Sequence, residues 1–106
     1  MTEQELINMF VNEYSMDKRD AIILACRNIE LLAKLKNGIV RFSYKKNDGT
    51  TRVATGTLAE KALPLIKGNG RPTAPSLFLY YDTEKSSYRS FKRINLLKIE
   101  GYENYN

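Results

Sequence analysis

Residues 39–58 read IVRFSYKKNDGTTRVATGTL, and this stretch decides the fold. Apolar and polar side chains alternate through residues 39–45, which is the period of a strand with one apolar face. That apolar face carries Val40, Phe42 and Tyr44. Asn47-Asp48-Gly49 follows as a turn, because an Asp-Gly pair accepts the positive φ that a tight hairpin needs. Residues 51–58 return as a second strand, in which Gly56 predicts a bulge or a close backbone approach.

Two amphipathic helices are expected before this hairpin. Thr2 and Glu5 fit a capping box, in which each side chain bonds the backbone N–H of the other, so a first helix is predicted over residues 3–13. A second helix is predicted over about residues 17–36, with acidic residues suited to its N-terminus. The apolar stripes are Leu6, Ile7, Phe10 and Val11 in the first helix, and Ile22, Ile23, Cys26, Ile29, Leu32 and Ala33 in the second.

The rest of the chain combines one long loop with short strands. All three prolines fall in residues 59–76, so we expect a loop there, opened by a short helical turn at residues 59–66. Further strands are predicted at residues 77–81, 88–93 and 95–100, the last of them with Leu97 and Ile99 inward. Residues 101–106 show no partner pattern and are expected to be frayed.

Two helices followed by five short strands predict an α+β fold, in which N-terminal helices precede a small five-stranded β-barrel. A packed sheet with helices on one face is the alternative. We divide the chain into a helical segment at residues 1–37, a barrel at residues 38–100 and a flexible tail at residues 101–106. With 106 residues, these parts are expected to form one compact domain.

The composition argues against most catalytic chemistry. The chain has no histidine and a single cysteine, Cys26, so it can form neither an internal disulfide nor a Cys-His pair. Histidine is also the commonest metal ligand. Cys26 lies in an apolar stretch and is expected to be a small buried side chain. We therefore expect a protein that is not an enzyme and that holds no metal or cofactor.

The N-terminal sequence Met-Thr-Glu-Gln-Glu has no basic region, and no apolar run approaches the ~18 residues of a membrane span. The sequence therefore predicts a soluble, cytoplasmic protein with no membrane partner.

Several short segments together resemble a known pattern. They are residues 40–50, 52–58, 68–71, 80–82 and 88–91, which read VRFSYKKNDGT, RVATGTL, GNGR, YYD and YRSF. In this order they resemble the small Sm-like, SH3-type barrel relatives of the WYL domain, which occur in bacteria and phages. Members of that family often carry tryptophan where this chain has Tyr88. The resemblance implies an SH3/Sm-like barrel that binds a ligand or nucleic acid, with Arg89 and Phe91 as the contacting pair.

Charge is distributed unevenly along the chain. The net charge of +5 divides into −1 over residues 1–36, from five basic and six acidic side chains, and +6 over residues 37–106, from twelve basic and six acidic ones. The positive field therefore belongs to the barrel and suggests an anionic partner. Charge that serves only solubility is the alternative.

Three groups of residues are candidate binding sites. Arg89 could clamp an anion, or it could pair at the barrel rim with Asp82 if Phe91 points inward. Tyrosines and arginines could form a stacking platform, or the tyrosines could be core. Basic residues around the Gly68-Asn69-Gly70 loop could wrap an anion, or the loop could be a connector. The candidate binding residues are Arg41, Lys67, Arg71, Tyr80, Tyr88, Arg89, Phe91 and Arg93.

Two functional hypotheses follow. The first is a non-catalytic module that binds nucleic acid or a nucleotide through a basic, aromatic-bearing barrel surface. The second is a bacterial or phage regulatory adaptor that binds a host protein, or a second copy of itself, through the helical N-terminus. The apolar face of the first helix could pack on such a partner or on the barrel.

Overall fold

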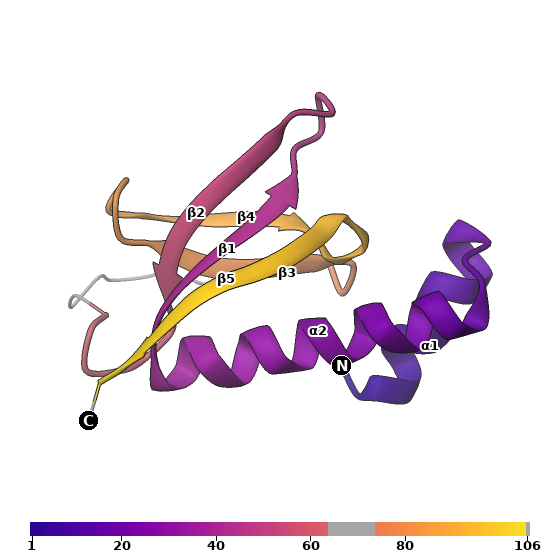
Figure 1. The fold of residues 1–106 in the computed structure, drawn as a ribbon, viewed down its shortest axis with the longest axis horizontal. Coiled ribbons are helices and arrows are strands. Elements are labelled where there is room, and N and C mark those ends of the chain that lie inside the picture. Colours follow the sequence, from indigo (N-terminus) through magenta and orange to yellow (C-terminus); the bar gives the residue numbers. More distant parts are fainter. Residues whose placement is uncertain (64–73, 106) are drawn as a thin grey trace.

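The structure is a computed structural model and describes residues 1–63 and 74–105. These described residues form two helices, a five-stranded antiparallel sheet and a short 3₁₀ helix (Figure 1). Along the chain these are α1 (Glu3–Tyr14), α2 (Lys18–Asn37), β1 (Gly38–Lys45), β2 (Thr51–Thr57), β3 (Leu77–Asp82), β4 (Ser87–Lys92), the 3₁₀ helix η1 (Arg93–Asn95) and β5 (Leu96–Asn104). The strand order is β4-β3-β2-β1-β5, which confirms the predicted helices followed by five strands.

The capping box predicted for α1 is present. The Thr2 hydroxyl accepts from the Glu5 backbone N–H at 3.1 Å, and the Glu5 carboxylate accepts from the Thr2 N–H at 2.9 Å. Ser15 ends the helix in the left-handed conformation, with φ 54°. The inward face of α1 buries Leu6, Ile7, Met9 and Phe10 in the main core. The predicted apolar face of this helix therefore packs inside the domain.

Helix α2 lies along one side of the sheet, and α1 packs beside its N-terminal half (Figure 1). Its inward residues are Ala21, Leu24, Ala25, Asn28, Leu31 and Leu35. The predicted stripe was therefore wrong in phase, because Ile22, Ile23 and Ile29 are exposed. The prediction of a buried Cys26 is also wrong, because this thiol is exposed. Asn28 explains the error: its amide donates to the carbonyl oxygens of Leu24 and Arg93, so a polar residue occupies the inner face.

Gly38 joins the second helix directly to the first strand. A Cβ atom at this position would lie 2.0 Å from the carbonyl oxygen of Glu103 on β5, so only glycine allows the two strands to approach this closely. Gly56 on β2 is similar, because a Cβ there would lie 2.9 Å from the carbonyl oxygen of Tyr81. The close backbone approach predicted at Gly56 is therefore confirmed.

The sheet folds over so that β4 covers the inner face of β1, although these strands are not neighbours in the sheet. The Phe91 ring lies 4.4 Å from the Tyr44 ring and 5.8 Å from the Phe42 ring, measured between centroids. Phe78 and Tyr80 on β3 complete this aromatic core. These contacts pack the two halves of the curved sheet against each other, as in a small, partly open barrel.

Strand β5 differs from its prediction in phase and in length. Leu97 was expected to point inward but is exposed, and Leu96 is buried in its place, because η1 and two register shifts against β1 change the alternation. The inward orientation expected for Ile99 is confirmed, since this side chain packs against the core. The frayed tail expected from residue 101 is also wrong for residues 101–104, which pair with the first half of β1. A strand as long as β1 needs a partner along its whole length to satisfy its backbone N–H and C=O groups.

The long loop is described only in part. Leu63 donates to the carbonyl oxygen of Ala59, which forms the start of the predicted helical turn. Lys67 and Arg71 lie outside the described residues, so the predicted loop site is not described. No helix in the described part of the chain is both long enough and apolar enough to cross a membrane.

Candidate functional site

A hollow opens where the β1–β2 hairpin separates from β3. Strands β2 and β3 pair at only two positions, Gly56 with Asp82 and Thr57 with Tyr81. Beyond these pairs the β1–β2 hairpin projects away from α2, while β3 and β4 run across the direction of the hairpin (Figure 1). The hollow between the hairpin and β4 has a volume of about 600 Å³. It is lined by Tyr44, Lys45, Lys46, Asn47, Asp48, Arg52, Leu77, Arg89, Ser90, Phe91 and Lys92.

The lining of this hollow is strongly basic. Its cations come from both sides: Lys45, Lys46 and Arg52 from the hairpin, and Arg89 and Lys92 from β4. The carboxylate in the lining, Asp48, accepts from the Thr50 hydroxyl at 2.6 Å and from the Thr50 N–H at 2.9 Å. These bonds lower the pKa of Asp48 and commit it to the hairpin turn. The lining thus holds five cations and one carboxylate; Asp82, directly behind it, neutralises Arg52, which leaves a net charge of +3.

A buried carboxylate holds the inner wall of the hollow. Asp82 is fully buried and accepts from Arg52 Nη2 at 2.5 Å and from the backbone N–H groups of Glu84 and Lys85. Burial alone would raise the pKa of Asp82. The Lys85 N–H bond and the Arg52 guanidinium outweigh burial, so the pKa lies below its ordinary value. Asp82 is therefore ionised and fixes Arg52 in place.

Arg89 approaches the same carboxylate oxygen less closely. Its Nε atom lies 3.9 Å from Asp82 Oδ2, which is longer than a hydrogen bond, and its side chain is 43% exposed. Of the two alternatives considered for Arg89, the structure shows the position at the rim near Asp82, with Phe91 pointing inward. One carboxylate oxygen serves two guanidinium groups, so Arg89 keeps donors that are available to a ligand.

Stacked aromatic rings form the floor of the hollow. Phe91 lies between Phe78 and Tyr44, with interplanar angles of 12° on both sides. The Tyr44 hydroxyl and the Tyr80 hydroxyl are 2.9 Å apart and share a hydrogen bond. Burial and this bond raise the pKa of Tyr80, so its hydroxyl stays protonated. The floor is a rigid, satisfied part of the core.

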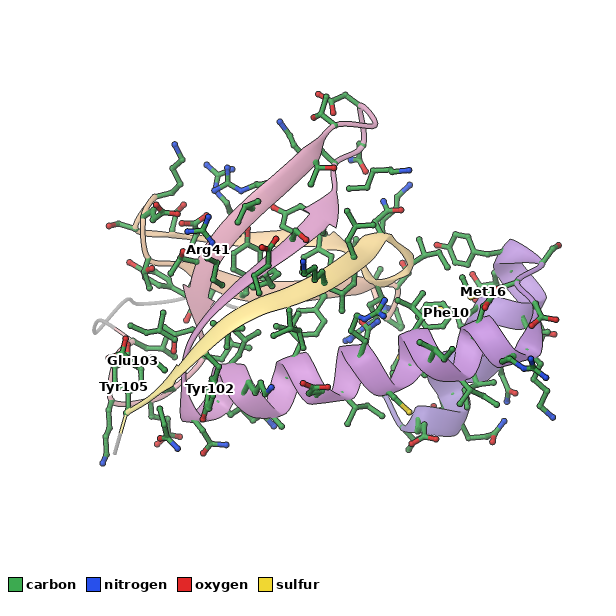
Figure 2. The ribbon with its side chains drawn as sticks, in the orientation of Figure 1. Phe10, Met16, Arg41, Tyr102, Glu103 and Tyr105 are labelled. Atoms are coloured by element: carbon green, nitrogen blue, oxygen red, sulfur yellow. The ribbon has the colours of Figure 1, made fainter. Side chains whose placement is uncertain are left out.

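Of the six predicted binding residues that the structure describes, Arg89 and Phe91 line the hollow. Tyr80 lies beneath it as a core residue with no exposed surface. Arg41 is exposed on β1, three residues before Tyr44 and therefore on the opposite face of the strand (Figure 2).

Tyr88 and Arg93 have other contacts. Tyr88 meets Tyr81 edge to face at 5.2 Å. Arg93 lies 5.0 Å from the centre of the Phe78 ring and donates to the Pro75 carbonyl oxygen, and burial lowers its pKa. Its guanidinium therefore braces the segment before β3.

Four cationic residues that line the hollow are not among the predicted binding residues. They are Lys45, Lys46, Arg52 and Lys92. The hollow exists because the hairpin tip lies opposite β4, a pairing of segments some forty residues apart that no local pattern reveals. The charge of +6 over residues 37–106 was the available signal.

Comparison with known proteins gave one match. The profile of the WYL_2 family, described as an Sm-like SH3 beta-barrel fold, matches residues 28–97. The matched segment begins within α2, ends within β5 and contains every residue that lines the hollow. Searches of curated proteins and of solved structures found no match.

Proposed function

Because this chain belongs to the WYL_2 family of Sm-like SH3 β-barrels, we propose that it is a non-catalytic module that binds the phosphate groups of nucleic acid or a nucleotide. The binding site is the basic hollow between the β1–β2 hairpin and β4. A protein with this function would act in the cytoplasm of a bacterial or phage-infected cell, where nucleic acid is present.

One observation carries this proposal: cations from two distant segments converge on one hollow. Lys46 on the hairpin and Lys92 at the end of β4 line the same space as Arg89. Cations gathered in this way repel one another, which is a cost that a bound polyanion relieves. Guanidinium and ammonium groups are also the usual partners of phosphate oxygens.

The hollow supports binding better than catalysis. Proton transfer needs a positioned acid and base. Asp48, the carboxylate in the lining, accepts two hydrogen bonds from Thr50. Asp82, which is buried directly behind the lining, pairs with Arg52 and accepts hydrogen bonds from two backbone N–H groups. Both carboxylates therefore serve structure, and the side chains left to meet a ligand are mainly cations.

The adaptor hypothesis relied on the apolar face of the first helix. That face packs into the domain core, because Leu6 and Phe10 have almost no exposed surface. The apolar face of this helix is therefore buried in the fold, where it contributes to stability and is not exposed to a second protein.

Replacement of Arg89 with glutamine should weaken nucleic-acid binding. Fluorescence anisotropy of a labelled single-stranded oligonucleotide, measured over a series of salt concentrations, gives the affinity and its salt dependence. Wild type should bind more weakly as salt rises, because bound phosphates release counterions. The Arg89→Gln protein should lose affinity, with a log–log salt slope shallower by about 0.7.

The matched control is Arg19→Gln, which removes the same charge from the exposed N-terminal end of α2. The control should keep nearly all of the affinity. Equal losses in the two variants would contradict the proposed site, and no binding by wild type at low salt would contradict the proposed function.

A further inference from the structure

We infer that the hollow recognises the sugar–phosphate backbone of a polynucleotide and does not stack its bases, an inference that rests on the proposed function. The sequence suggested a stacking platform, since seven of its eleven aromatic residues are tyrosine. The structure places the relevant rings where a base cannot reach them. Recognition by charge without stacking is a different binding mode, with its own specificity.

The rings at the floor of the hollow have no open face. Phe91 stacks on two other core rings, with its centroid 5.2 Å from that of Phe78 and 4.4 Å from that of Tyr44. Both Phe91 and Tyr44 are 5% exposed. A base stacks by laying its plane on an accessible ring face, so a ring already enclosed in a stack of core aromatics offers it no surface.

The neighbouring tyrosines are also unable to serve. Tyr80 is fully buried and its hydroxyl is bonded to that of Tyr44. Tyr88 lies three residues before Phe91 on β4 and therefore on the opposite face of the strand. Its ring packs edge to face on Tyr81 instead of facing the hollow.

The exposed aromatic rings lie away from the hollow. Tyr102 is on β5 and pairs with Val40, four residues before Tyr44 on β1, which is a separation of about 13 Å along the strand (Figure 2). Lys34 of α2 lies over the Tyr102 ring, 5.6 Å from its centre. Tyr14 is exposed at the end of α1, and Tyr105 is exposed directly after the end of β5. These rings are not arranged to receive bases from a strand whose phosphates occupy the hollow.

The groups that do face the hollow suit phosphate oxygens. Arg89 is half-exposed and presents a guanidinium fork that can hold two oxygens of one phosphate. Lys45, Lys46 and Lys92 are exposed point charges around it. Such contacts are the same for every nucleotide, so binding should depend on the number of phosphates and be indifferent to base identity.

The test compares two labelled oligonucleotides of equal length and equal phosphate number. One carries thymine at every position, and the other carries an abasic tetrahydrofuran residue at every position. Stacking contributes about 5- to 150-fold in affinity per base, so a stacking site would discriminate strongly between them. We expect anisotropy to give dissociation constants that agree within about threefold. If the abasic oligonucleotide bound more than about threefold more weakly than the thymine oligonucleotide, the inference would be wrong, but the proposed function would not be contradicted.

The Arg89→Gln protein gives an independent check. It should weaken both complexes by the same factor, because Arg89 contacts only phosphate. A loss confined to the thymine oligonucleotide would overturn backbone recognition. Failure of wild type to bind either oligonucleotide would overturn the proposed function itself, so the two failures can be distinguished.

Discussion

Replacement of Asp82 with alanine is expected to lower the free energy of unfolding by about 3–5 kcal/mol, because it leaves the Arg52 guanidinium without its partner in a largely buried position. The backbone N–H groups of Glu84 and Lys85 lose their acceptor at the same time. Small domains have a total stability of only about 5–15 kcal/mol, so the variant should be partly unfolded or close to it. Urea titration followed by circular dichroism measures the change.

Asp48→Ala is the matched control for this substitution. Asp48 also accepts hydrogen bonds in a hairpin turn, but it is fully exposed, so its removal should lower the free energy of unfolding much less than the removal of Asp82 does. A loss at Asp82 no larger than the loss at Asp48 would contradict the structural role of the buried pair.

The stability that Asp82 provides should also depend on pH. Its pKa is lowered in the folded state, so this stability is fully present above the unfolded pKa of about 3.9 and is lost as the pH falls through the folded pKa. The Asp82→Asn protein should lack this part of the acid-induced loss, because an amide does not titrate. Identical acid titrations of wild type and Asp82→Asn would show that Asp82 contributes nothing to the pH dependence.

The second large effect is expected at the N-terminal helix. Phe10 has no exposed surface and lies in the core with Leu6, so Phe10→Ala should cost about 3–5 kcal/mol through lost burial and the cavity left behind (Figure 2). Tyr14→Ala on the same helix is the control, because Tyr14 is exposed and its truncation should cost little.

The same helix lies outside the segment that matches the family, which begins at residue 28. If residues 15–106 alone unfolded at the same urea concentration as the whole chain, the core role of α1 would be wrong. If residues 15–106 unfolded at a much lower urea concentration than the whole chain, the barrel of this protein would depend on α1, which the family match does not include.

Local chemistry made much of this fold predictable. The Asp-Gly turn fixed the β1–β2 hairpin, and the Thr2–Glu5 capping box fixed the start of α1. Each signal involves residues at most a few positions apart, so neither depends on the rest of the molecule. The family resemblance then indicated the barrel correctly.

Features set by distant contacts could not be predicted. The face of α2 that turns inward includes a polar residue, Asn28, whose amide donates to the Arg93 carbonyl oxygen 65 residues away in the sequence. The length of β5 is determined by β1, which it must cover. The spacing of apolar residues predicts a helix. When two faces of that helix both carry apolar and polar side chains, the spacing does not show which face packs against the core.

The site was only half predictable for the same reason. Alternation along β4 placed Arg89 and Phe91 on one face, and family resemblance selected them. The sequence could not show that the Phe91 ring would stack on Tyr44 and Phe78. It also could not show that Lys46 and Lys92 would line the same hollow. These facts depend on how the hairpin folds over the second pair of strands.

The most direct test of the account is the salt dependence of single-stranded DNA binding by a triple variant of the hollow. Lys46, Arg89 and Lys92 are exposed, so replacing all three with glutamine removes charge without disturbing the core. The matched control replaces Lys18, Arg19 and Lys36, which are exposed on α2, and it changes the net charge equally. The account predicts that the hollow variant loses most of its affinity and that its log–log salt slope becomes shallower by about 2, whereas the control keeps the wild-type slope. If the two variants bind alike, the hollow is not where the protein meets nucleic acid.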